Sequence, residues 1–205
     1  MKKKRILFDF DGTIIDSKYT HEGDLFKSHL FEEEFDRLDV NKILLDYEDT
    51  FYRYDIDAFI RFAKSKYNIT FTRELMEKWI DLGDDDDSKL FPDTIETLDY
   101  LKHKGCSLAI CSNWFTRAQI RRVNEFGLSD YFDDIRGGDF VLKPNKDAFL
   151  GCIGEFRIEE CIMIGDSYYK DYVGPIRMGM DAIYVNRKND NKGGIKQLKK
   201  IKEIL

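Results

Sequence analysis

Short apolar runs alternate with helix-like segments along most of this chain, and this alternation limits the fold more than any other feature. The strand-like runs lie at residues 6–8, 107–111, 134–136, 161–164 and 182–185. Helical patterns lie at 92–104, before Gly127, from about 147 and at 172–178. Repeated strand–helix–strand units require a parallel sheet with right-handed crossovers and helices on both faces. We therefore predict an α/β fold built on a doubly wound parallel sheet.

One long helical stretch interrupts the alternation after the first strand-like run. Between residues 17 and 88 apolar residues recur at helical spacing, as in 59–63 and in 75–80 behind a candidate N-cap at Thr72. We predict a small inserted helical domain at 17–88 and a core domain formed by 1–16 and 89–205. A further amphipathic helix is expected at the C-terminus, where Ile195, Leu198 and Ile201 recur at helical spacing.

Polar residues follow the strand-like runs, at the edge of the sheet where ligands bind in open α/β folds. They are Asp9, Asp11 and Thr13 after the first run, Ser112 and Asn113 after the second, Lys143 before a later helix, and Asp166 and Asp171 after the fourth run. A single Asp after a strand is usually a helix cap or a turn residue. Turn preference does not explain a whole set of this kind, so we predict a functional site at this edge.

Four carboxylates at one edge would repel one another unless a cation neutralised them. The set has only oxygen ligands and no histidine or thiol, which favours Mg²⁺. The four cysteines have neither C-x-x-C spacing nor a histidine at zinc-finger distance, so zinc is not expected. We predict a magnesium site at the carboxyl ends of the strands.

Four short motifs resemble, in order, those of the haloacid dehalogenase superfamily. They are DFDGT at 9–13, SN at 112–113, KP at 143–144, and GDS at 165–167 with Asp171. The resemblance spans nearly the whole predicted core, and the helical insertion resembles the family's cap domain in its most common position. It implies a Rossmann-like sheet with a cap domain and a magnesium-dependent phosphatase activity on a small phosphate monoester.

By this resemblance Asp9 is the nucleophile that forms an aspartyl-phosphate, and an ionised carboxylate needs no base to activate it. Asp11 is implied to be the general acid for the leaving oxygen and then the base for the hydrolytic water. That role requires Asp11 to hold a proton near neutral pH, so its pKa is expected well above the usual value of about 3.9. The backbone carbonyl of Asp11 is also an implied metal ligand, beside the carboxylates of Asp9 and Asp166.

The remaining motif residues are implied to serve the phosphate group or the metal. Thr13, Ser112, Asn113 and Lys143 resemble the family's phosphate contacts, which stabilise charge on the transferred phosphoryl group. Asp171 is expected to hold Lys143 or a metal-bound water. These assignments are expectations from the resemblance.

Three other functions remain open at this point. A sugar phosphomutase of the same superfamily shares all four motifs, so sequence does not separate it from a phosphatase. A dehalogenase is disfavoured because those members lack the second aspartate that Asp11 supplies. A non-catalytic binding module is disfavoured because all the carboxylates are present.

Charge and hydropathy limit the classes of partner that the protein is expected to bind. Residues 17–88 carry nineteen acidic and ten basic side chains, a net charge of −9, which would repel a long polyanion such as nucleic acid. No apolar run approaches the 18 or so residues of a transmembrane helix, and the apolar residues 6–8 after the basic start are too few for a secretory signal. We expect a cytoplasmic protein without nucleic-acid or membrane partners, whose oligomeric state and individual substrate the sequence leaves open.

Overall fold

The core of the molecule is a five-stranded parallel sheet with β1 (Arg5–Phe8) at its centre. The computed structural model describes residues 4–16, 39–82, 88–187 and 190–205. The strand order is β5-β4-β1-β6-β7, with β4 (Ser107–Cys111), β5 (Asp134–Arg136), β6 (Cys161–Gly165) and β7 (Asp181–Tyr184), and every pairing is parallel. The predicted doubly wound parallel sheet is confirmed, and each strand lies within one residue of its expected bounds.

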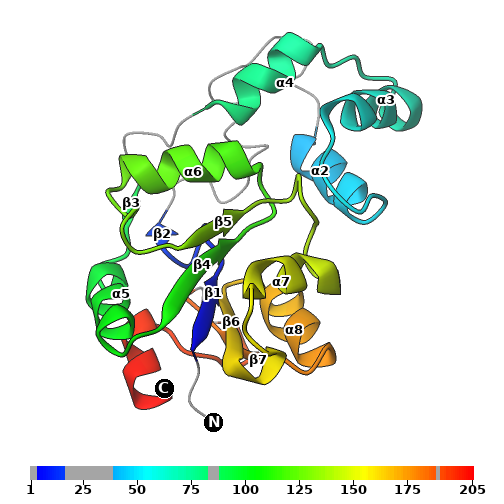
Figure 1. Cartoon of the computed structure of the whole chain (residues 1–205). Coiled ribbons are helices and arrows are strands. Elements are labelled where there is room, and N and C mark those ends of the chain that lie inside the picture. Colours follow the sequence, from blue (N-terminus) through cyan, green and yellow to red (C-terminus); the bar gives the residue numbers. More distant parts are fainter. Residues whose placement is uncertain (1–3, 17–38, 83–87, 188–189) are drawn as a thin grey trace.

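Alternating side chains of the strands divide the core into two apolar layers. Ile6 and Phe8 pack in one layer, against α5 (Thr94–His103), α6 (Thr116–Glu125) and the C-terminal 3₁₀ turn η4 (Leu198–Glu203). Leu7 packs in the other layer, against α7 (Lys146–Ile153), near α8 (Gly174–Arg177). Because successive residues of a strand point to opposite faces, a central strand covered on both sides must be apolar throughout. Figure 1 shows α5 and α7 on opposite sides of the sheet.

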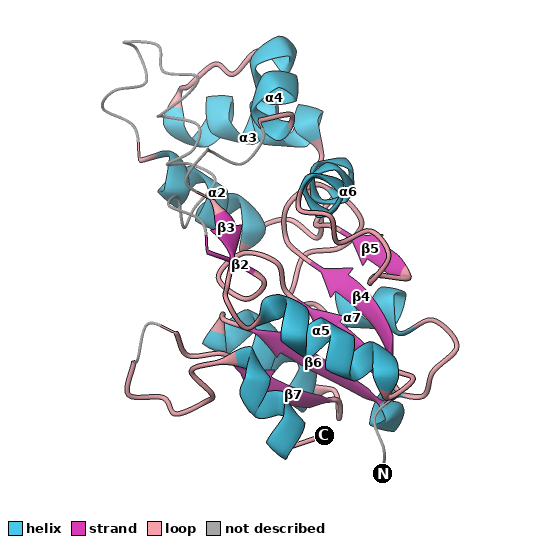
Figure 2. Ribbon diagram, turned by 90° about the vertical axis from the view of Figure 1, so that its left-hand side faces the viewer, coloured by secondary structure: helices cyan, strands magenta, loops and turns pink. Residues whose placement is uncertain are grey.

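Three helices stand beyond the carboxyl ends of the strands, α2 (Val40–Glu48), α3 (Ile56–Tyr67) and α4 (Arg73–Ile80), as Figures 1 and 2 show. Thr72 caps α4 by accepting a hydrogen bond from the backbone N–H of Leu75 at 3.1 Å, as its sequence position predicts. Residues 17–38, at the start of the predicted inserted domain, and residues 83–87, just before its last residue, lie outside the described residues. The division into domains therefore stays a prediction.

An aromatic cluster joins these three helices to the rest of the protein. The indole of Trp114 lies 5.4 Å from that of Trp79, and Phe115 stacks on Tyr54 at 5.3 Å, between ring centroids. Two backbone hydrogen bonds connect the same parts: Tyr54 N–H donates to the carbonyl of Gly138, and Leu142 N–H donates to that of Tyr52. Helices and core thus share one apolar cluster.

Three local features differ from the sequence prediction. A two-stranded antiparallel pair, β2 (Ile15–Asp16) with β3 (Lys89–Leu90), was not predicted, because two-residue strands leave no periodic pattern. The helix expected at 172–178 begins earlier, as a π-helical turn η3 (Tyr168–Val173) that continues into α8. The C-terminal helix is a 3₁₀ turn, and Ile195 bridges to Val185 instead. No helix among the described residues is long and apolar enough to cross a bilayer.

Candidate active site

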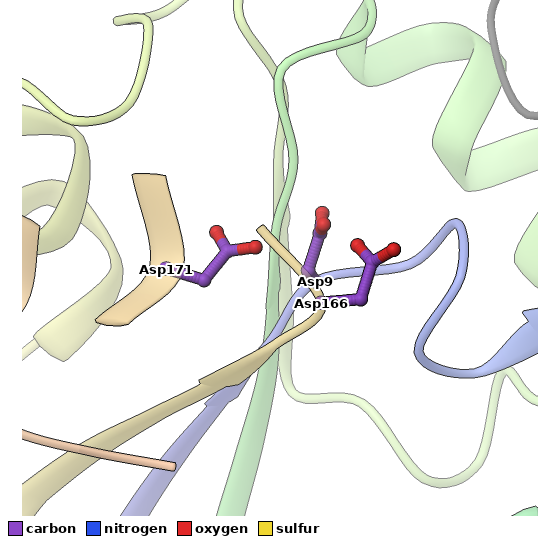
Figure 3. A group of neighbouring side chains, drawn as sticks. All are labelled: Asp9, Asp166 and Asp171. Atoms are coloured by element: carbon purple, nitrogen blue, oxygen red, sulfur yellow. The ribbon is translucent and has the colours of Figure 1, made fainter. Parts of the chain in front are cut away.

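The site lies where β1 and β6, neighbours in the sheet, come to an end. Asp9 directly follows β1, and its backbone N–H donates to the carbonyl of Ile164 at 2.9 Å. Asp166 directly follows β6, and Asp171 lies in η3. These three side chains each offer an oxygen, and the oxygens lie within 4.8 Å of one another. Figure 3 shows the Asp9 carboxylate between those of Asp166 and Asp171.

Lys143 is the buried cation of this cluster. Its Nζ lies 2.7 Å from Oδ1 of Asp171 and 3.0 Å from Oδ1 of Asp9, and only 2% of its side chain is exposed. Burial lowers the pKa of Lys143, but the charges of Asp171 and Asp9 outweigh it and raise the pKa overall. Burial and the charge of Asp171 raise the pKa of Asp9, although Lys143 opposes them. Among the described residues, one ammonium therefore serves two carboxylates.

Two glycines allow the carboxylates to come this close to the backbone. A Cβ at Gly12 would lie 2.2 Å from Oδ2 of Asp166, and the φ of Gly12 is +70°, which other residues rarely adopt. A Cβ at Gly165 would lie 2.4 Å from Cγ of Asp171. The Asp171 carboxylate also accepts a hydrogen bond from the backbone N–H of Ser167 at 3.0 Å. The local sequence thus fixes where the acids lie.

Ser112, at the end of β4, is arranged as a hydrogen-bond donor. Its Oγ accepts from the backbone N–H of Trp114 at 3.2 Å and from Nε2 of Gln119 at 2.7 Å. A hydroxyl has two acceptor positions and one hydrogen, so the hydrogen of Ser112 remains available to a substrate oxygen. Thr13 offers a second hydroxyl, since it is fully buried and its Oγ1 has no hydrogen-bond partner among the described residues.

Asn113 is engaged with the backbone of Lys143. Its Oδ1 accepts from the Lys143 N–H at 2.8 Å, and its Nδ2 donates to the Lys143 carbonyl at 3.2 Å and to Glu48 at 3.3 Å. Both amide hydrogens are therefore used within the protein. These contacts orient the loop that carries Lys143, while a phosphate contact by Asn113 stays a prediction.

Asp11 faces a different partner from Asp9. Its carboxylate accepts two hydrogen bonds from Arg122 of α6, at 2.9 and 2.5 Å. Burial raises the pKa of Asp11, but the charge and hydrogen bonds of Arg122, with a contribution from Gln119, lower it overall. The expectation of a raised Asp11 pKa is therefore wrong for this arrangement, because the sequence motif carries no sign of the arginine.

A family profile described as haloacid dehalogenase-like hydrolase matches residues 6–185, nearly the whole chain. The chain belongs to the haloacid dehalogenase-like hydrolase family. Over its full length it also superposes on the crystal structure of a haloacid dehalogenase phosphatase from Thermococcus onnurineus, with a TM-score of 0.64, 26% identity and 97% of that chain covered.

Curated relatives of this haloacid dehalogenase-like hydrolase carry phosphatase names. It is 33% identical over 135 residues, 56% of this chain, to a glyceraldehyde 3-phosphate phosphatase of Methanothermobacter thermautotrophicus, and spans 58% of that relative. It is 35% identical over 40% of its length to a phosphoglycolate phosphatase of Agrobacterium fabrum, and spans 36% of it. It is 26% identical over 88% of its length to a Pyrococcus furiosus glyceraldehyde 3-phosphate phosphatase, and spans 80% of that relative. The matches to the first two thus span less than two thirds of those relatives.

The residues of this family member suit a divalent cation. Asp9 and Asp166 present carboxylate oxygens side by side, with no nitrogen or sulfur ligand in the group that the described residues form. Among the described residues, the ammonium of Lys143 is shared by Asp9 and Asp171. An all-oxygen, electron-rich cluster of this kind fits Mg²⁺.

Three side chains of the site were not foreseen from the sequence: Gln119, Arg122 and Glu48. The first two face the motifs from α6. Glu48, the last residue of α2, accepts from the hydroxyl of Tyr54 at 2.8 Å and pairs with Lys170 of η3. It therefore connects the helices beyond the sheet with the loop after β6. None belongs to a recognisable motif, and only the tertiary contacts reveal them.

Proposed function

We propose that this protein is a magnesium-dependent phosphatase that hydrolyses a small phosphate monoester through an aspartyl-phosphate at Asp9. One observation carries the proposal: Asp9 directly follows the central strand, and its carboxylate pairs with buried Lys143 and lies beside Asp166. A fixed carboxylate next to a buried cation suits in-line attack on a phosphoryl group, whose charge needs compensation.

Two chemical steps follow from these residues. In the first, a carboxylate oxygen of Asp9 bonds to phosphorus and the bond from phosphorus to the ester oxygen breaks. Asp11, in the protonated form that its contact with Arg122 makes less populated, gives that oxygen a proton. In the second, Asp11 takes a proton from water, the water oxygen bonds to phosphorus, and the bond to Asp9 breaks. Inorganic phosphate is released and both aspartates return to their starting states.

The surrounding groups hold the phosphoryl oxygens during both steps. We assign the binding of these oxygens to the ammonium of Lys143 and to the hydroxyls of Ser112 and Thr13. Neither hydroxyl donates a hydrogen bond to another described residue. Asp171 keeps Lys143 in place. A bound Mg²⁺, held by Asp9, Asp166 and the backbone carbonyl of Asp11, would neutralise charge on the phosphate group.

The substrate we propose is compact. Residues 17–88, which we propose form the cap, carry a net charge of −9, and this disfavours polyanions near the site. The names of the relatives, glyceraldehyde 3-phosphate phosphatase and phosphoglycolate phosphatase, refer to small three- and two-carbon phosphate esters. A cap that closes over such a molecule would exclude water from the first step.

Release of inorganic phosphate from a panel of monoesters tests the proposal. The panel contains sugar phosphates, glyceraldehyde 3-phosphate, phosphoglycolate and a 5′-phosphorylated oligonucleotide, each with Mg²⁺ and with EDTA. We expect free phosphate from one or more small esters with Mg²⁺ and none with EDTA. Activity that EDTA leaves unchanged would contradict the metal assignment, and an oligonucleotide better than every small ester would contradict the substrate class. Phosphate that only moves within a sugar bisphosphate would indicate a phosphomutase instead.

A further inference from the structure

Arg122 holds the carboxylate of Asp11 with both arms of its guanidinium. Nη1 donates to Oδ2 at 2.9 Å and Nη2 donates to Oδ1 at 2.5 Å. The arginine is 92% buried, since its relative exposure is 8%, and its guanidinium lies 4.9 Å from the centroid of the Phe10 ring. A two-armed pair of this kind fixes both the plane and the direction of a carboxylate. Asp11 is thus held more firmly than a single contact would hold it.

Gln119 extends this pair to a second residue of the site. Its Oε1 accepts from Nη1 of Arg122 at 3.0 Å, and its Nε2 donates to Oγ of Ser112 at 2.7 Å. Gln119 is fully buried and lies three residues before Arg122, so both side chains share one face of α6. A buried chain of hydrogen bonds therefore connects the group after β1 with the group after β4.

We propose that Arg122 is a positioning residue, which together with Gln119 sets the Asp11 carboxylate relative to the Ser112 hydroxyl. The inference rests on the proposed phosphatase function. A general acid must come within about 2.6–3.2 Å of the oxygen that it protonates. Ser112 would hold the phosphoryl group and Asp11 would face the ester oxygen bonded to it. A link between the two residues fixes the spacing that this transfer requires.

The quality of the leaving group distinguishes this role from a general structural one. An alkoxide leaves only when a proton reaches it, whereas p-nitrophenolate leaves without one. Loss of Arg122 makes protonated Asp11 more populated but misplaces it, so the positioning role predicts damage to alkyl ester hydrolysis and nearly intact aryl ester hydrolysis. We expect Arg122→Met to lower kcat/KM for glycerol 2-phosphate by about 10²-fold or more, and for p-nitrophenyl phosphate by less than about tenfold, given the usual 10²–10⁴-fold contribution of general acids.

Three companion variants make the test specific. Arg122→Lys keeps the charge but loses the two-armed contact, so it should restore only part of the alkyl ester activity. Arg121→Met removes the neighbouring arginine of α6, whose hydrogen bonds go to the carbonyls of Asp81 and Leu82. This variant should leave kcat/KM unchanged for both substrates. Asp11→Asn combined with Arg122→Met leaves no unpaired carboxylate, and it keeps the test available if Arg122→Met alone fails to fold.

The double variant also measures whether Arg122 acts through Asp11. Without Asp11 the aspartyl-phosphate lacks the base for its hydrolysis, so these variants are compared by the initial burst of p-nitrophenolate that phosphorylation of Asp9 releases. In the Asp11→Asn background the further change Arg122→Met should alter the rate of this burst by less than about threefold, because the group that Arg122 positions is already gone. Equal losses for both substrates in Arg122→Met or Arg122→Lys, or a full further loss in the Asp11→Asn background, would overturn the inference. Turnover that survives Asp9→Asn would instead overturn the proposed function, so the two failures are distinguishable.

Discussion

The Asp9 and Asp11 sides of the site differ in their charge balance, although only one residue separates the two acids. On the Asp9 side, one ammonium, Lys143, serves both Asp9 and Asp171, and Asp166 adds a further carboxylate. On the Asp11 side, the guanidinium of Arg122 holds the Asp11 carboxylate with two hydrogen bonds, and a neutral glutamine lies beside it. The pKa of Asp9 is raised by burial and Asp171, and that of Asp11, despite burial, is lowered by Arg122. The distant partners, and not the motif, set the chemistry of each aspartate.

The largest expected effect comes from Asp9→Asn. An amide neither attacks phosphorus nor supplies a negative ligand, so turnover should fall by at least about 10⁴-fold. Steady-state phosphate release measures the loss, and mass spectrometry should find no phosphoryl adduct. The matched control is Asp16→Asn, which removes an exposed aspartate at the end of β2 and should retain full activity. Full activity in the Asp9 variant would exclude the covalent mechanism.

Removing the buried ammonium should be the largest change in stability. Lys143→Met leaves Asp9 and Asp171 without their shared cation, and breaking a buried ion pair typically costs about 3–5 kcal/mol. Denaturant unfolding with EDTA measures it. Lys146→Met removes an exposed lysine at the start of α7 and should stay within about 0.5 kcal/mol of the wild type. Adding Asp171→Asn to Lys143→Met should recover part of the loss, and a merely additive loss would contradict the shared pair.

Stabilisation by a divalent cation should be a smaller effect, and it should depend on the Asp9 side of the site. Mg²⁺ at 100 times its dissociation constant would stabilise the native state by about 2.7 kcal/mol, because it binds only the folded protein. Thermal unfolding with and without Mg²⁺ measures the shift. Asp166→Asn should remove most of it, whereas Gln119→Met, on the Asp11 side, should preserve it. An equal shift in both variants would show that the cation does not bind beside Asp9.

The pH dependence of stability, without divalent cations, should have opposite signs for the two acids. The raised pKa of Asp9 means that the folded protein disfavours its ionised form, so its contribution is lost as pH rises from the usual Asp value of 3.8 through the folded pKa. The lowered pKa of Asp11 stabilises the fold above 3.8, and that contribution is lost as pH falls through the folded pKa. When unfolding is measured at several pH values, the free energy of unfolding should fall less steeply towards neutral pH in Asp9→Asn than in the wild type. It should fall less steeply towards acid pH in Asp11→Asn. The same slope change in both would contradict the comparison.

The sequence predicts the sheet well because each strand is a short apolar run with clear ends. Residues 134–136 were predicted with their observed bounds, and the motif residues after β1 and β6 do meet, together with Lys143. Ser112, after β4, connects to Asp11 through Gln119 and Arg122. The surroundings of Asp11 were not predictable in this way. Arg122 is 111 residues distant along the chain and lies in an ordinary helical pattern. A local pattern specifies which acids are present, but their charge state depends on contacts that only the folded chain makes.

The aromatic cluster that joins α2, α3 and α4 to the core limits how the upper part of the molecule can move. Trp114 and Phe115 come directly after Asn113 of the site, and both are buried against rings from α4 and from the segment between α2 and α3. Lifting the helices away would expose these rings to water, while sliding the helices over them would keep them covered. Opening by shear is therefore favoured over opening by a free hinge. A shortened chain without residues 40–80 would carry an exposed apolar patch beside its catalytic loop and should aggregate.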